Sequence, residues 1–211
     1  MKTEAFEAKD LAVISPLSLI ISQGEIVDGV AKPFILSKPD IEFGAYAVKQ
    51  GVKILWIGPV GRDLNGEILT NICSRDSVAC RFVEKTGAHT STTHMMRPSN
   101  LGSVVEYYPG ANSVFLPSDI DEDYLCSAGV KMVYIASMLQ LPLFCENHAK
   151  RTVAKIQKLR SKDVNVTIGG LGRVSWAEDL SDMDEAMIVC NLQEYASYMM
   201  TYEHIIECIR R

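Results

Sequence analysis

Short apolar runs recur along the chain and predict the strands of a parallel sheet. Strands of this kind are covered on both faces, so they read as nearly uncharged runs instead of alternating patterns. Five segments fit this description: residues 11–14, 54–58, 131–136, 164–168 and 186–190. Their spacing leaves room for a helix or a further element between consecutive strands, as α/β folds require.

Helical spacing of apolar residues occurs between these runs. In residues 40–50, Ile41, Ala45 and Val48 fall on one side of a helix, and Gly51 stops it. Further helices are predicted at residues 64–73, 116–125, 147–159 and 191–200, the second of them capped by Ser118 or Asp119. The alternation predicts a doubly wound, mostly parallel α/β sheet.

Two stretches have the pattern of exposed β-structure. Residues 24–36 alternate loosely and are broken by glycine and proline, which is typical of short strands or a hairpin. Residues 77–83 begin a second β-rich excursion, in which residues 90–93 and 103–108 are expected to pair around a turn at 98–102. His89 and His94 lie in this excursion, and we interpret both as surface residues without joint chemistry.

Composition narrows the class of protein. With 211 residues and 47% hydrophobic content, the chain can bury one sizeable core, so we expect a single domain over residues 1–211. A net charge of -5 offers no basic face for nucleic acid, and no apolar run approaches the length of about 20 residues that crosses a bilayer. Six cysteines without a Cys-x-x-Cys pair, and no signal peptide, indicate reduced thiols and a cytoplasmic protein. Cys145 and His148 have no second pair beside them, so no metal site is predicted.

The most informative stretch is Gly-Val-Lys-Ile-Leu-Trp-Ile-Gly-Pro-Val-Gly-Arg-Asp-Leu-Asn-Gly, residues 51–66. An uncharged strand runs here into a turn in which Gly58, Gly61 and Gly66 allow tight backbone geometry, and Asp63 can cap the following helix. In open α/β sheets, ligands bind at this carboxyl edge. The pattern alone is also that of an ordinary βα connection.

With its neighbours, the stretch resembles the ribokinase-like (PfkB) carbohydrate kinase family. The resemblance rests on Gly-x-Val-Gly-x-Asp-x-x-Gly, then Thr86-Gly87, Tyr108-Pro-Gly-Ala-Asn112 and Asn191-Leu-Gln-Glu194, in the family's order. It implies a sugar substrate, ATP and Mg²⁺, and lid strands from about residues 18–36 and 80–112. By resemblance, Glu42, Gly110 and Asn112 would bind substrate, and Asn191 and Glu194 would face Mg²⁺ and phosphate. For Glu42 we favour the alternative of a solvated residue on the helix surface, and Asn191 with Glu194 can equally form a capping box.

The sequence departs from the family pattern at positions that would bind substrate or carry out catalysis. Ile20 occupies the position of a sugar-binding aspartate, Ser37-Lys38 replace a glycine pair, and Ile168 and Gly170 stand where an aspartate and an asparagine are expected. Residues 169–172 could form an anion-binding nest or a plain flexible loop. The Gly-Ala-Gly-Asp motif, which supplies the family's catalytic base and anion hole, does not occur in the 211 residues.

The sequence therefore predicts a ribokinase-like domain, C-terminally truncated and degenerate, that is inactive alone and has no catalytic residues of its own. The alternative is a non-catalytic binding or oligomerisation module on the same scaffold, for which a homodimer would form through the lid or an exposed sheet edge. The hypothesis of a plain Rossmann-like nucleotide-binding domain has less support, because no Gly-x-Gly-x-x-Gly motif follows the first strand.

Overall fold

The main sheet of the computed structural model is parallel throughout. The structure describes residues 8–22, 26–27, 30–31, 34–36, 46–75, 79–96, 104–169, 197–198 and 202–210. Within them, six strands pair in the order β12-β11-β10-β1-β6-β7. Their bounds are β1 (Leu11–Ile14), β6 (Ile54–Gly61), β7 (Ala79–Lys85), β10 (Met132–Ile135), β11 (Asn165–Ile168) and β12 (Ser197–Tyr198). Every pairing between them is parallel.

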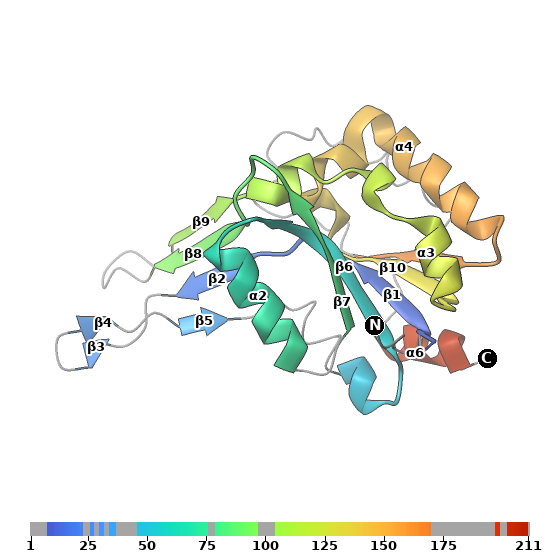
Figure 1. The fold of residues 1–211 in the computed structure, drawn as a ribbon, viewed down its shortest axis with the longest axis horizontal. Coiled ribbons are helices and arrows are strands. Elements are labelled where there is room, and N and C mark those ends of the chain that lie inside the picture. Colours follow the sequence, from blue (N-terminus) through green and yellow to red (C-terminus); the bar gives the residue numbers. More distant parts are fainter. Residues whose placement is uncertain are drawn as a thin grey trace, which may run out of the picture.

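Helices cover both faces of this sheet (Figure 1). Helices α3 (Glu122–Ser127) and α4 (Pro142–Arg160) pack on one face, while α2 (Leu64–Arg75) and α6 (Tyr202–Arg210) pack on the other. Alternate residues of β1 serve the two layers: Ala12 and Ile14 join the first core, and Leu11 and Val13 join the second. The doubly wound α/β architecture predicted from the apolar runs is confirmed.

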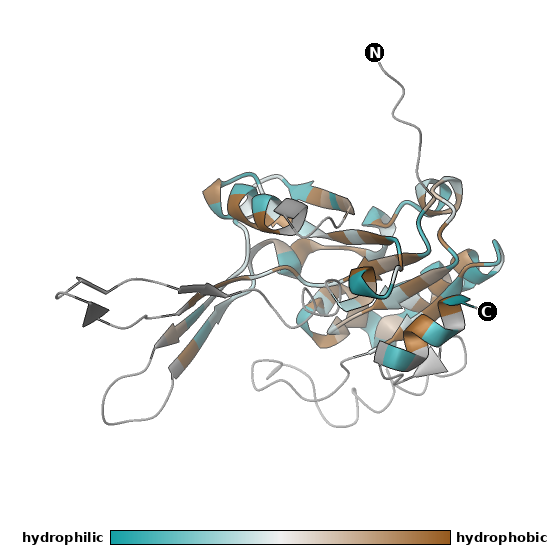
Figure 2. Cartoon of the chain, turned by 90° about the horizontal axis from the view of Figure 1, so that it is seen from below, coloured by the Kyte–Doolittle hydropathy of each residue, from teal (hydrophilic) through white to brown (hydrophobic). Residues whose placement is uncertain are grey.

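A second, small sheet projects from the body of the molecule (Figures 1 and 2). Its order is β5-β2-β8-β9, with β2 (Leu19–Ser22), β5 (Phe34–Leu36), β8 (Thr92–Met96) and β9 (Val104–Tyr108). β2 pairs with β8 in parallel, and the other two pairings are antiparallel. Next to it, β3 (Ile26–Val27) and β4 (Val30–Ala31) form a separate two-stranded hairpin. The pairing expected for residues 90–93 and 103–108 is confirmed as β8 with β9.

One predicted lid segment belongs to the main sheet instead. Residues 79–85 form β7, which pairs in parallel with β6 along its whole length. Most of its side chains are half-buried, because β7 is an edge strand with one neighbour. The excursion predicted for residues 80–112 therefore contributes only β8 and β9 to the small sheet, followed by the short helix η1 (Gly110–Val114).

Two predicted boundaries are wrong. Strand β6 extends to Gly61, so Gly58 and Gly61 are strand residues and not part of a turn. The helix expected at residues 116–125 divides into the short helix η2 (Pro117–Asp119) and α3, whose cap is Asp121. The Asp121 side chain accepts a hydrogen bond from the N–H of Tyr124 at 2.9 Å, which neither Ser118 nor Asp119 does.

Helix α4 is longer than predicted and contains a break. It begins at Pro142, after the short helix η3 (Met138–Gln140), and loses helical backbone angles from Glu146 to Ala149. Across the break, the Thr152 hydroxyl donates a hydrogen bond of 2.7 Å to the carbonyl of Phe144 and satisfies an acceptor that a continuous helix would have paired. The helix expected over residues 191–200 is contradicted at residues 197–198, which form β12. The strand expected at 186–190 lies outside the described residues.

Candidate functional site

The small sheet leaves the main sheet at the carboxyl edge, where strand β1 ends. The connection, residues 15–18, is buried and lined by hydroxyl groups. Ser15 accepts a hydrogen bond of 2.9 Å from the indole N–H of Trp56, so it ties the end of β1 to β6. The Ser18 and Thr93 hydroxyls are 2.9 Å apart and join this connection to β8. Neutral polar groups therefore mark the junction between the two sheets.

Asn112 lies at the same junction and is fully buried. Its Oδ1 accepts from the N–H of Leu17 at 3.1 Å, and its Nδ2 donates to the carbonyl of Leu17 at 3.0 Å. Nδ2 also donates to the hydroxyl of Tyr107 at 2.9 Å. Both amide hydrogens of Asn112 are thus engaged within the protein, and the residue links β9 to the residues after β1. Its role as a substrate ligand stays a prediction.

Burial governs the chemistry of Tyr107. Burial raises the pKa of Tyr107, and the hydrogen bond from Asn112 offsets part of this effect. The hydroxyl therefore remains protonated at neutral pH and is a hydrogen-bonding group, not a base.

Asp63 caps α2 as the sequence predicted. Its Oδ1 accepts the N–H of Gly66 at 2.9 Å. The carboxylate also reaches Thr90, 27 residues further along the chain, where it accepts the backbone N–H at 2.7 Å and the hydroxyl at 2.6 Å. Burial alone would raise the pKa of Asp63, but these hydrogen bonds from Thr90 and Gly66 outweigh it and lower the pKa. Sequence reasoning missed Thr90, because the local helix signal gives no information about this distant partner.

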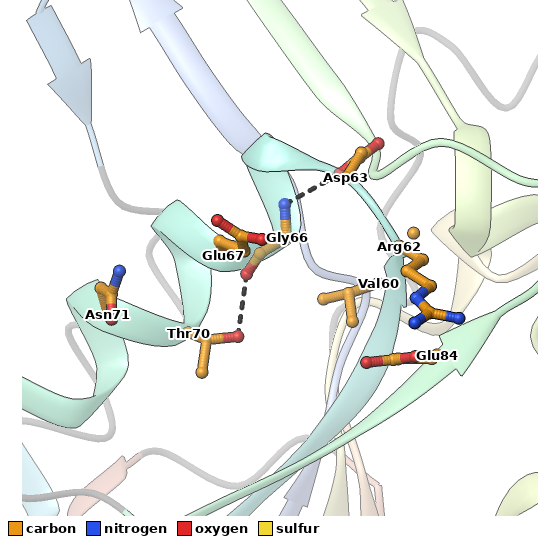
Figure 3. A pocket seen from close by; sticks show the side chains of 9 residues that line it. Val60, Arg62, Asp63, Gly66, Glu67, Thr70, Asn71 and Glu84 are labelled. Atoms are coloured by element: carbon orange, nitrogen blue, oxygen red, sulfur yellow. Dashed lines mark hydrogen bonds between the residues drawn. The ribbon is translucent and has the colours of Figure 1, made fainter.

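An open pocket of about 520 Å³ lies where β6 ends and α2 begins (Figure 3). Its lining is polar and carries both signs of charge: Val60, Gly61, Arg62, Asp63, Gly66, Glu67, Thr70, Asn71 and Glu84. In Figure 3, Glu67, Thr70 and Asn71 follow α2, while Arg62 and Glu84 lie across the pocket from them. Gly110 and Asn112, the predicted site residues that the structure describes, do not line this pocket.

The remaining predicted site residues are placed as follows. Gly110 opens η1 with a φ of +45°, and a side chain there would lie 2.3 Å from the carbonyl oxygen of His89. Ile20, at the position of the expected aspartate, lies on β2 opposite Thr93. Glu42, Asn191 and Glu194, with Gly170 and the glycine-rich residues after it, lie outside the described residues.

The histidines of the excursion are separate from one another. The side chain of His89 is 95% exposed, and its Nδ1 is 3.5 Å from Oδ2 of Asp63. His94 lies on β8 and makes an edge-to-face contact with Tyr108, with 5.5 Å between ring centroids. The two rings therefore have different partners.

The arrangement of metal-ligating side chains in the described residues bears on how Mg²⁺ could be held. Mg²⁺ takes oxygen ligands from carboxylates, amides, phosphates and water. Within the described ranges, no three His, Cys, Asp or Glu side chains are grouped so that they could hold a metal ion. Mg²⁺ can also be held by one or two carboxylates together with substrate phosphates and water, so its binding to this chain stays a prediction. Among the described residues, the helices do not combine the length and the apolar character of a membrane span.

The fold and the junction define a doubly wound α/β domain with a small β-sheet at the carboxyl edge of its main sheet. The sequence profile of the pfkB family carbohydrate kinases matches residues 45–205 of this chain. This match covers most of the sequence, and the chain belongs to the PfkB carbohydrate kinase family. A search of curated proteins found no match.

Solved structures with this fold include several sugar kinases. A PfkB protein from a Polaromonas species shares 14% identity over 96% of this chain and 73% of its own, with a TM-score of 0.69. A fructokinase from Xylella fastidiosa shares 11% identity over 96% of this chain and 69% of its own, with a TM-score of 0.68. An Escherichia coli protein assigned as ribokinase II, solved with ATP and Mg²⁺, shares 14% identity over 95% and 68%, with a TM-score of 0.67. These similarities establish the ribokinase-like fold.

Proposed function

We propose that this chain binds a neutral, polyhydroxylated ligand of the sugar class between the small sheet and the carboxyl edge of the main sheet. The observation that carries the proposal is the junction itself, where β2 and β8 leave the edge at which α/β folds bind ligands. The small sheet would act as the lid over the ligand.

The groups at the junction favour a neutral ligand. Ser18, Thr93, Tyr107 and Asn112 are uncharged, and hydroxyl groups can both donate and accept. Ser18 and Thr93 each have one hydroxyl hydrogen, and the hydrogen bond between them uses one of the two. The second hydroxyl hydrogen can then be donated to an oxygen atom of a ligand. At position 20, where the family resemblance places an aspartate, this chain has isoleucine. Strand β2 therefore lacks a charged hydrogen-bond acceptor at this position. We therefore expect weaker sugar binding than a carboxylate would give.

For catalysis, we propose that the 211 residues do not transfer a phosphoryl group by themselves. Transfer needs a base for the attacking hydroxyl and an anion hole for the moving phosphoryl group. The family's Gly-Ala-Gly-Asp motif would supply both, and it does not occur in this sequence. Where ATP and Mg²⁺ are bound, Asn191 and Glu194 are the residues we expect to face them, and by family resemblance their side chains would orient Mg²⁺-bound water and phosphate.

The proposal is tested by isothermal titration of the purified chain with a panel of pentoses, hexoses and nucleosides. We expect saturable binding of at least one compound and no ATP consumption in the presence of Mg²⁺. Thr93→Val removes the hydroxyl at constant shape and is expected to weaken binding about fivefold, the loss of one hydrogen bond of about 1 kcal/mol.

The matched control is Thr92→Val, because Thr92 is the neighbouring residue of β8 and its side chain points to the opposite face. We expect this variant to bind like the wild type. Absence of binding across the whole panel would contradict a sugar-binding role. Sustained ATP consumption would contradict the claim that these residues cannot transfer phosphate.

A second candidate function is self-association through the small sheet. Strand β9 is an edge of that sheet, with Val105 41% exposed and Tyr108 53% exposed. Edge strands with exposed apolar residues are templates for pairing with another strand. Light scattering tests this: we expect a dimer that Val105→Lys converts to a monomer, and a monomeric wild type would exclude it.

A further inference from the structure

The segment that leads into β8 is held more tightly than a connecting loop requires. Thr90, two residues before β8, is only 3% exposed. Its hydroxyl accepts the N–H of Gly61 at 2.9 Å and donates to Oδ1 of Asp63 at 2.6 Å. Its own N–H donates to Oδ2 of Asp63 at 2.7 Å. We call this set of hydrogen bonds the Asp63–Thr90 clamp.

The backbone packs closely around the clamp. A β-carbon on Gly61 would lie 2.5 Å from both the N atom of Thr90 and the carbonyl oxygen of Ala88. On the other side, the carbonyl of His89 accepts the N–H of Ala111 at 2.7 Å. The segment is therefore enclosed between the end of β6 and the beginning of η1. Directly after it, β8 begins and pairs with β2 and β9.

The Asp63 carboxylate does more than cap a helix. A cap needs one acceptor oxygen, and Oδ1 meets this need through Gly66. The second oxygen is directed to the backbone of Thr90. Asp121, the cap of α3, shows the difference, because its second oxygen pairs instead with the exposed side chain of Arg81 at 3.1 Å.

We propose that Asp63 is a positioning residue for the ligand site. Through its hydrogen bonds to Thr90 it fixes the segment where β8 begins, and so sets the position of the small sheet over the carboxyl edge of the main sheet. Any motion of the small sheet then takes place beyond Ser91 and not in the connecting segment. The effect on ligand affinity rests on the proposed sugar-binding function, while the clamp itself can be tested without ligand.

The variants separate capping from clamping. In Asp63→Asn, one oxygen can still cap α2, but the amide cannot also accept the N–H of Thr90. Thr90→Val removes the hydroxyl that links Gly61 to Asp63, whereas Thr90→Ser keeps it. Asp121→Asn is the matched control, since it changes a helix cap in the same way without any contact to the small sheet.

Hydrogen exchange of the full chain, followed by mass spectrometry without ligand, is the first measurement. We expect Asp63→Asn and Thr90→Val to speed exchange about tenfold in peptides covering residues 88–96 and 104–108, with β10 and β11 unchanged. Thr90→Ser and Asp121→Asn should exchange like the wild type. Unchanged exchange in β8 and β9, or an equal increase in every strand, would overturn the proposal.

Ligand titration is the second measurement and uses the compound from the sugar panel that the wild type binds. We expect Asp63→Asn to raise the Kd about tenfold, Thr90→Ser to restore binding relative to Thr90→Val, and Asp121→Asn to have no effect. Wild-type Kd in the Asp63→Asn variant would overturn the positioning role. If the wild type binds no compound of the panel, the sugar-binding function fails, and the exchange result still decides whether the clamp exists.

Discussion

Asn112 and Leu17 form a reciprocal pair of hydrogen bonds across 95 positions of sequence. The amide oxygen of Asn112 accepts the N–H of Leu17, and its nitrogen donates to the carbonyl of the same residue. A side-chain amide thus pairs with the backbone as a neighbouring strand would. This satisfies both backbone groups of a buried residue at the point where the chain turns out of β1.

Asn112→Ala is expected to lower the free energy of unfolding by about 2–4 kcal/mol. The substitution leaves the N–H and carbonyl of Leu17 without partners in a buried site. It also removes the amide group that donates a hydrogen bond to the Tyr107 hydroxyl. Urea denaturation followed by circular dichroism measures the change. Ser113→Ala is the control, because the Ser113 hydroxyl donates a local hydrogen bond to the carbonyl of Gly110, three residues earlier. A loss for Asn112→Ala no larger than for Ser113→Ala would contradict this role.

Acid sensitivity is expected at the contact between α3 and α4. Glu122 is nearly buried and pairs with Lys155, at 2.6 Å, and with Lys158. Burial alone would raise the pKa of Glu122, but hydrogen bonds from the two lysines outweigh it and lower the pKa to about 2. The stabilisation is therefore present above the unfolded-state pKa of 4.5 and is lost as the pH falls from there through the folded-state pKa of about 2.

Glu122→Gln should remove this pH dependence and destabilise the protein at neutral pH by about 2 kcal/mol. The expected loss is kept this small because the Lys158 side chain is half exposed, so solvent screens its interaction with Glu122. Unfolding free energies measured between pH 7 and pH 3 provide the comparison. Asp123→Asn is the control: this neighbouring carboxylate is exposed and pairs with Lys162 on the surface. Parallel pH profiles for wild type and Glu122→Gln would show that the ion pair does not contribute.

The central part of the fold could be predicted because its strands are apolar in sequence. Residues 11–14 and 54–58 read as buried runs, and both are buried strands of the main sheet. The edge strand β7 was misassigned because its side chains are half-buried and its composition resembles that of the small sheet. The break at residues 146–149 had no clear sequence signal, since it contains neither Gly nor Pro, the residues that most strongly disfavour a helix.

The candidate site was less predictable, because its contacts join residues far apart in sequence. Asp63 was recognised as a cap from the helix that follows it, but its bond to Thr90 depends on how β8 returns past the end of β6. Asn112 was expected to contact a ligand, and the structure engages both its amide hydrogens within the protein. Local pattern finds helix caps and buried strands, whereas these pairings come from the topology of the chain.

Cys145 is expected to be unreactive in the native protein. It is buried in the core between the sheet and α4, and burial raises the pKa of its thiol to about 12. Because the thiolate is the reactive form, alkylation requires unfolding. Iodoacetamide labelling at pH 8, read by mass spectrometry, should modify the half-buried Cys126 before Cys145. Rapid labelling of Cys145 under native conditions would contradict its burial.

Ser15 provides the last test, at the point where the small sheet begins. The indole N–H of Trp56 donates to its hydroxyl, and both residues are buried. Ser15→Ala leaves that N–H without an acceptor, so we expect a loss of about 1–3 kcal/mol in unfolding free energy, measured by urea denaturation. Ser127→Ala removes a hydroxyl of the same size that bonds locally on the exposed end of α3, and should cost well under 1 kcal/mol. Equal losses for the two variants would mean that another group, such as a water molecule, takes the indole hydrogen bond when Ser15 is removed.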